Sequence, residues 1–165
     1  MSRSRQTQSS LFREAANVRI AGYKQACEDL KTRYTSTVET IKKILDTRLR
    51  IIISTTNNSD EVKDLLALLS ECISKLYRCK NDSSSLTRQL ESEASNLADY
   101  ARCTKQTFEQ LPDVQEITVI KSGTSRYIDA LDGWMRRLRS AYAENDLARV
   151  VLAFRGLRVA IGEIS

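Results

Sequence analysis

Apolar side chains recur every three or four residues along most of this 165-residue chain, as one face of an α-helix requires. The spacing predicts a first helix over residues 10–54, with one interior glycine. Its apolar positions are Leu11, Ala15, Val18, Tyr23, Cys27, Leu30, Tyr34, Val38, Ile41, Leu45 and Ile52. Residues 55–59 combine poor helix formers with turn formers, and Asn58 precedes Glu61 by three residues, as in a capping box. Such a short connector lets two helices pack antiparallel as a hairpin.

The second predicted helix has the most regular pattern in the chain. From Val62 to Leu90 the small and apolar positions alternate steps of three and four, which is the heptad repeat of a coiled coil. Two successive steps of four, ending at Ala94, indicate a stutter, after which the pattern continues to Leu111. We name the predicted partner-facing positions the seam. The seam residues are Val62, Leu65, Leu69, Leu76, Leu86, Leu90, Leu97 and Phe108.

Residues 81–85 are weak helix formers, and a break there would give two shorter helices of a compact bundle instead. The apolar pattern keeps its phase across them, which favours one continuous helix. Pro112 then ends the helix, and residues 113–120 alternate polar and apolar side chains with many β-branched residues. This alternation predicts a strand-like or irregular connector over residues 112–124.

Two shorter amphipathic helices follow, with Asn145 as a candidate N-cap between them. Their apolar positions are Tyr127, Leu131, Trp134, Leu138 and Tyr142, then Leu147, Val150, Val151, Phe154, Leu157 and Ile161. The sequence therefore predicts an all-α fold. We expect a disordered basic tail (1–9), a long antiparallel coiled-coil hairpin (10–111), the connector (112–124) and a C-terminal helical hairpin (125–165).

Composition removes most catalytic chemistry from consideration. One proline and five glycines are too few for the turns of a compact all-β domain. Histidine is absent, so the commonest general base and metal ligand is missing. The four cysteines form no Cys-x-x-Cys pair and are expected to be small core residues of a reducing compartment. We expect no catalytic residue, metal or cofactor.

The net charge of +5 is concentrated near the beginning of the chain, since residues 1–24 hold five basic groups and one acid. The arginines of the C-terminal hairpin favour a solvated face, with contact to a partner as the alternative. Together with arginines near the beginning of the chain, they are the candidate contacts for an acidic partner, either the acidic tails of a filament or nucleic acid. They are Arg3, Arg5, Arg13, Arg136, Arg137 and Arg139. The longest aliphatic run, residues 51–53, is too short for a membrane span, and no small-molecule substrate is expected.

The apolar arc of the long helices is wider than a coiled-coil seam. The residues that widen it are Ile44, Ile51, Ile53, Leu66, Leu68, Ile73 and Tyr77. Either the C-terminal hairpin or helices of other subunits must cover it. The sequence predicts a non-enzymatic scaffold or adaptor that joins other coiled-coil subunits in a hetero-oligomeric assembly of the cytoskeletal, spindle, kinetochore or trafficking type. We expect it in the cytoplasm, on the cytoskeleton or in the nucleus. The alternatives are a basic nucleic-acid-binding or coat protein, and a monomeric helix bundle that acts as a regulator.

Overall fold

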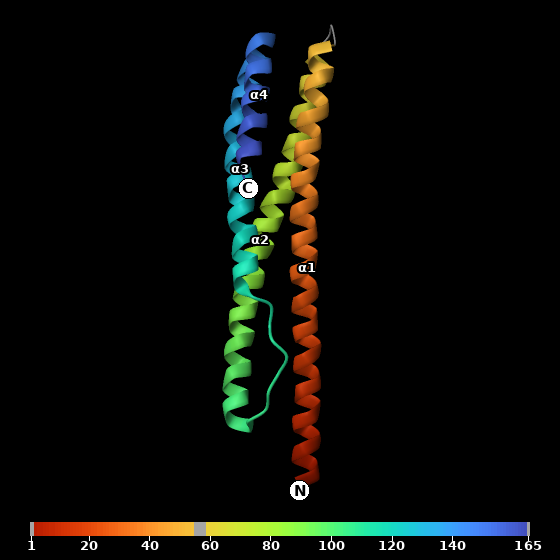
Figure 1. Cartoon of the computed structure of the whole chain (residues 1–165), viewed down its shortest axis with the longest axis vertical. Helices are drawn as coiled ribbons and strands as arrows, with labels where there is room; N and C mark the ends of the chain where they lie inside the picture. Colours follow the sequence, from red (N-terminus) through yellow and green to blue (C-terminus); the bar gives the residue numbers. More distant parts are fainter. Residues whose placement is uncertain (1, 55–58, 165) are drawn as a thin grey trace.

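The protein is a bundle of four α-helices, and no strand occurs among the residues that the structure describes. The computed structural model describes the backbone of residues 2–54 and 59–164, and leaves aside the side chains of residues 2–10, 49, 53, 54 and 59. The helices are α1 (Ser2–Ser54), α2 (Ser59–Thr104), α3 (Val114–Ala143) and α4 (Leu147–Glu163). Neighbours run in opposite directions (Figure 1). The all-α prediction is confirmed.

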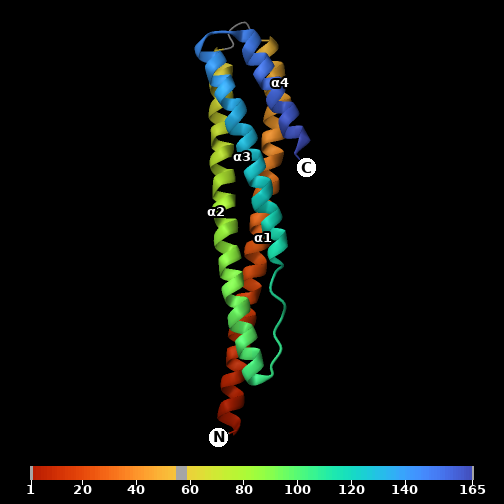
Figure 2. The same cartoon turned by 90° about the vertical axis from the view of Figure 1, so that its left-hand side faces the viewer.

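The bundle becomes thinner from one end to the other. At one end all four helices share a core that includes Leu45, Leu69, Leu131 and Phe154. In the middle only α1, α2 and α3 contribute, and at the far end α1 and α2 enclose Ala16, Ile20 and Leu97. Figure 2 shows the same order: α4 lies only in the upper part of the bundle, α3 extends further down, and α1 and α2 extend beyond both. The long helices α1 and α2 are therefore the frame, and α3 and α4 cover one part of it.

The heptad spacing of α2 continues without the predicted stutter. Every expected position from Val62 to Leu90 is buried. The next buried residues are Glu93 and Leu97, whereas Ala94 is exposed, so the steps of three and four simply go on. Glu93 is tolerated in this buried row because Arg19 of α1 donates a hydrogen bond from Nε to its Oε1 at 2.9 Å. The stutter prediction was wrong because the charged Glu93, paired with Arg19, takes the buried position that an apolar pattern gives to Ala94.

The beginning of α1 also differs from the prediction. Ala16 and Ile20 are buried, whereas Leu11, Ala15 and Val18, which were expected on the buried face, are exposed. The helix begins at Ser2, where a disordered tail over residues 1–9 was predicted. A formed helix gains one backbone hydrogen bond with each added residue, and residues 2–9 contain neither proline nor glycine to stop it.

α2 ends at Thr104, about two turns before the predicted end at Leu111. Lys105 has a φ of 55° and donates its backbone N–H to the carbonyl of Ala101, which terminates the helix in the left-handed region. Residues 105–113 then run back along the hairpin to the start of α3 (Figure 2). This early end lets the chain reverse direction, so that α3 can pack on α2.

The strand-like connector over residues 112–124 was wrong, because α3 begins at Val114. Asp113 is its N-cap and accepts a hydrogen bond from the backbone N–H of Gln115 at 2.9 Å. Ile117, Ile120 and Thr124 are buried at helical spacing, and the two isoleucines pack against α1 and α2. Burial of this face outweighs the strand preference of the β-branched residues, which depends strongly on context.

Close contacts between helices rely on two glycines. A Cβ at Gly123 would lie 2.2 Å from Oη of Tyr34, and one at Gly156 would lie 2.3 Å from ring atoms of Trp134. The turn between α3 and α4 places Asn145 at a φ of 54°, and Asp146 rather than Asn145 is the N-cap of α4. The predicted capping box at Asn58 lies outside the described residues.

Candidate functional site

Seven of the eight predicted seam residues are buried inside this chain, with exposed fractions from 0% to 7%. They are Val62, Leu65, Leu69, Leu76, Leu86, Leu90 and Leu97. The C-terminal hairpin provides part of their cover, since Ile44, Leu66 and Ile73 also pack against the core that α3 and α4 complete. In this conformation the seam is the core of the bundle. A partner has to bind elsewhere, unless the helices separate.

Phe108, the eighth seam residue, lies in residues 105–113, between α2 and α3, rather than in α2. Its ring lies 6.2 Å from that of Phe12 and 5.8 Å from that of Tyr100, and the rings of Phe12 and Tyr100 are stacked at 3.8 Å. These three aromatic side chains close the thin end of the hairpin over Leu97. Phe108 therefore packs within the chain, as the other seam residues do.

The arginines predicted to contact an acidic partner lie on two different helices, and they differ in their contacts within the chain. The side chains of Arg3 and Arg5 lie outside the described residues, and Arg13 is exposed on α1. Of the three predicted arginines on α3, Arg137 lies over the Trp134 ring at 4.3 Å, and Arg139 donates to Oγ of Ser70 at 3.3 Å. Arg136 is exposed. Arg137 thus contacts a ring of its own helix, and Arg139 joins α3 to α2.

Chemistry that needs reactive side chains finds little support in the described part of the chain. No three residues of the types His, Cys, Asp or Glu gather there around a possible metal position. Cys27, Cys72 and Cys79 are buried core residues as predicted, and burial raises the pKa of each thiol. Cys103 is exposed, contrary to the prediction, because it lies on the outer face of the last turn of α2.

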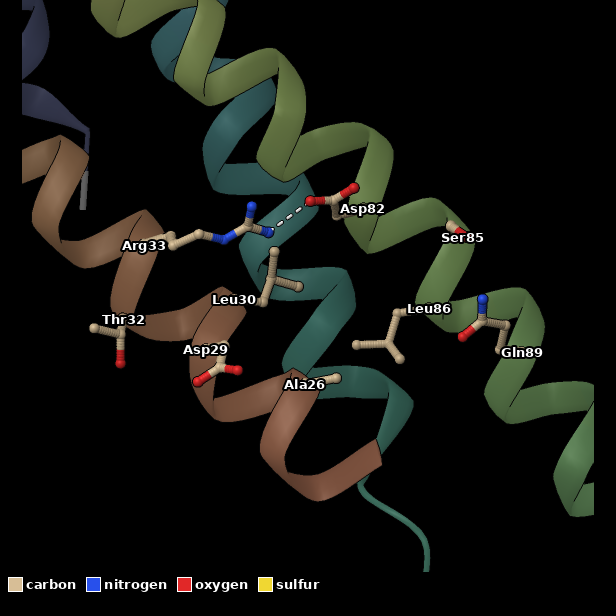
Figure 3. A pocket seen from close by; sticks show the side chains of 9 residues that line it. All are labelled: Ala26, Asp29, Leu30, Thr32, Arg33, Asp82, Ser85, Leu86 and Gln89. Atoms are coloured by element: carbon tan, nitrogen blue, oxygen red, sulfur yellow. Dashed lines mark hydrogen bonds and ion pairs between the residues drawn. The ribbon is translucent and has the colours of Figure 1, made fainter. Parts of the chain in front are cut away.

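A groove of about 650 Å³ lies between α1 and α2 (Figure 3). We name it the α1–α2 groove. Ala26, Leu30 and Leu86 form its apolar floor, and Leu30 and Leu86 are 2% and 7% exposed. Polar side chains line its rim: Asp29, Thr32 and Arg33 from α1, and Asp82, Ser85 and Gln89 from α2. An apolar floor with a polar rim is the usual anatomy of a protein-binding surface.

One ion pair crosses this groove. Arg33 donates from Nη2 to Oδ2 of Asp82 at 2.7 Å, and this hydrogen bond is the main reason that the pKa of Arg33 is raised. Both side chains are about half exposed, so the pair contributes little to stability and can rearrange. A second hollow of about 340 Å³ continues beyond it, lined by Ser36, Lys75 and Arg78 among others. The groove thus changes from apolar to basic along its length.

The exposed residues at the beginning of α1 form a second candidate surface, which we name the outer stripe. It consists of Leu11, Ala15, Val18 and Gly22, at steps of four, three and four. Leu11 is 59% exposed and Val18 is 72% exposed. The same helix face continues into the α1 wall of the groove. Leu11, Ala15 and Val18 were predicted on the buried face, and Gly22 was predicted only as an interior glycine of the helix. Sequence reasoning missed the groove, whose rim residues have no apolar signal.

Comparison with known proteins gives no relative, since no family model, curated protein or solved structure matches this chain. Within the described residues, none of the helices is long and apolar enough to cross a membrane. The candidate site therefore depends on the geometry of the chain itself.

Proposed function

We propose that this protein is a non-enzymatic helical adaptor. In this proposal α1 and α2 form a long antiparallel coiled-coil hairpin, α3 and α4 form a shorter hairpin that covers one side of it, and a segment of another protein binds the α1–α2 groove. The partner is a subunit of a larger assembly, of the cytoskeletal or trafficking type that the sequence predicted.

The observation that supports this proposal most is that a groove lies between α1 and α2 although the apolar seam of α2 is already buried within the chain. At 1.5 Å per residue, the 46 residues of α2 extend over about 70 Å, which is far longer than a compact domain of this size requires. α3 and α4 pack against one side of the frame, while the α1–α2 groove is lined by residues of α1 and α2 alone, with the buried Leu30 and Leu86 at its base. A long rigid helical surface with such a groove suits binding better than catalysis.

The test compares the proteins captured from cells by the wild type and by two tryptophan variants. Ser85→Trp places a large ring at the rim of the groove, above Leu30 and Leu86. Ser95→Trp is the matched control, because Ser95 is exposed on the same helix and does not line the groove. Circular dichroism establishes that both variants keep the helical content of the wild type.

We expect at least one protein to be enriched by the wild type and by Ser95→Trp, and to be lost with Ser85→Trp. Capture that is equal for all three proteins would contradict a role for the groove. Enrichment of nothing above the bare matrix would contradict the adaptor function itself.

A further inference from the structure

The outer stripe leaves two large apolar side chains in water, although the α1 residues on the opposite face are fully buried. Ala16 and Ile20 are 0% exposed, whereas Leu11 and Val18 are 59% and 72% exposed. The stripe contains no charged residue, and a Cβ at Gly22 would meet no other atom within 4 Å. Its steps of four, three and four are those of a coiled-coil seam, so a second helix can pack along it.

The order of side-chain sizes along the stripe indicates which helix fits. From Leu11 to Gly22 the sizes run large, small, large, small. Suppose that two copies meet antiparallel about a two-fold axis midway between Ala15 and Val18. Leu11 then faces Gly22 of the second copy, and Val18 faces Ala15 of the second copy, so every layer pairs one large residue with one small residue. In a parallel pair each residue would face the same residue of the second copy. Leu11 would then lie against Leu11, and the two Gly22 residues would leave a gap.

We propose that α1 forms a homodimer interface, in which the outer stripes of two copies pack antiparallel about this axis. The inference does not depend on the adaptor function, because the stripe lies before the groove on α1. With only four side chains from each copy, the contact is far smaller than a standard interface of roughly 20–30 residues a side. The dimer should therefore be weak and concentration-dependent.

Sedimentation equilibrium from about 10 µM to about 1 mM measures this association over the range of weak complexes. We expect the wild type to pass from monomer to dimer, and Val18→Asp to weaken the dimer at least about tenfold, because an unpaired carboxylate would be desolvated there. The matched control is Val159→Asp on α4, where the valine is 60% exposed. We expect this control to dimerise as the wild type does. A wild type that stays monomeric throughout, or equal loss in the two variants, would overturn the proposal.

Disulfide formation tests the antiparallel register separately. The experiment uses the full chain with Cys103→Ser, since Cys103 is the exposed cysteine and the other three are buried. We expect Leu11→Cys with Gly22→Cys to give covalent dimers on oxidation. Leu11→Cys alone should give none, because the two introduced thiols of an antiparallel pair would lie about 16 Å apart along the helix axis. Dimers from Leu11→Cys alone, or no dimers from the double variant, would contradict the antiparallel pairing.

Discussion

Replacing Glu93 by leucine tests the continuous heptad of α2. Glu93 is 8% exposed and lies between Leu90 and Leu97 in the buried row, where an apolar residue is normal. Its carboxylate accepts one hydrogen bond from Arg19 at 2.9 Å. The substitution removes this pair and adds apolar surface to the core.

The expected change follows from two opposing contributions. Burying a leucine side chain stabilises a fold by about 1.5–3 kcal/mol. Loss of the ion pair costs about 1 kcal/mol or less, because the Arg19 side chain is 43% exposed and stays hydrated after the change. We therefore expect Glu93→Leu to raise the free energy of unfolding by about 1–2 kcal/mol.

Urea unfolding followed by circular dichroism measures this difference. Ala94→Leu is the matched control, since Ala94 is the neighbouring exposed residue and its substitution should change the stability by less than about 0.5 kcal/mol. If Ala94→Leu stabilised the protein more than Glu93→Leu, the buried row would pass through residue 94, and the continuous heptad would be refuted.

Three further predictions concern the core, a close contact and alkaline pH. Leu76→Asp should unfold the protein, because an unpaired charge would replace a side chain that is 0% exposed, whereas Arg88→Asp on the surface should leave the helical signal unchanged. Gly156→Ala should lower the stability by about 1 kcal/mol through overlap with Trp134, whereas Gly133→Ala in open space should raise it by about 0.5–1 kcal/mol, as urea midpoints will show. Burial raises the pKa of three cysteines, so the folded state keeps their protons to higher pH than the unfolded state does. Stability should thus be constant near neutral pH and fall above about pH 8.5; a urea midpoint that rises there would contradict this.

The sequence predicted the helices well where their apolar pattern was regular. The row from Val62 to Leu90 is buried at every expected position. Ile44, Leu66 and Ile73 of the wider apolar arc pack against the core that the C-terminal hairpin completes, whereas Ile51 and Tyr77 stay exposed. Three helix boundaries were less accurate. The early end of α2 at Thr104 depends on where the chain must turn back to place α3, and no local residue preference encodes that requirement.

The candidate site was much harder to predict. The first part of α1 carries two rows of apolar residues, one with Ala16 and Ile20 and the other the outer stripe. Ala16 and Ile20 are the buried row because they pack against Leu97 of α2, and the outer stripe is left exposed. The α1–α2 groove brings together residues about fifty positions apart, such as Arg33 and Asp82. Their pairing follows from the register of the two helices, which a one-dimensional pattern does not contain.

The dependence of stability on protein concentration tests most directly the claim that the chain covers its own apolar seam. The measurement is the urea midpoint at about 1 µM and about 100 µM, made with Val18→Asp so that pairing through the outer stripe does not contribute. If the seam is covered by α1, α3 and α4 of the same chain, the two midpoints will coincide. A midpoint that rises with concentration would show that the seam is completed by a second chain, and would contradict the self-contained bundle described above.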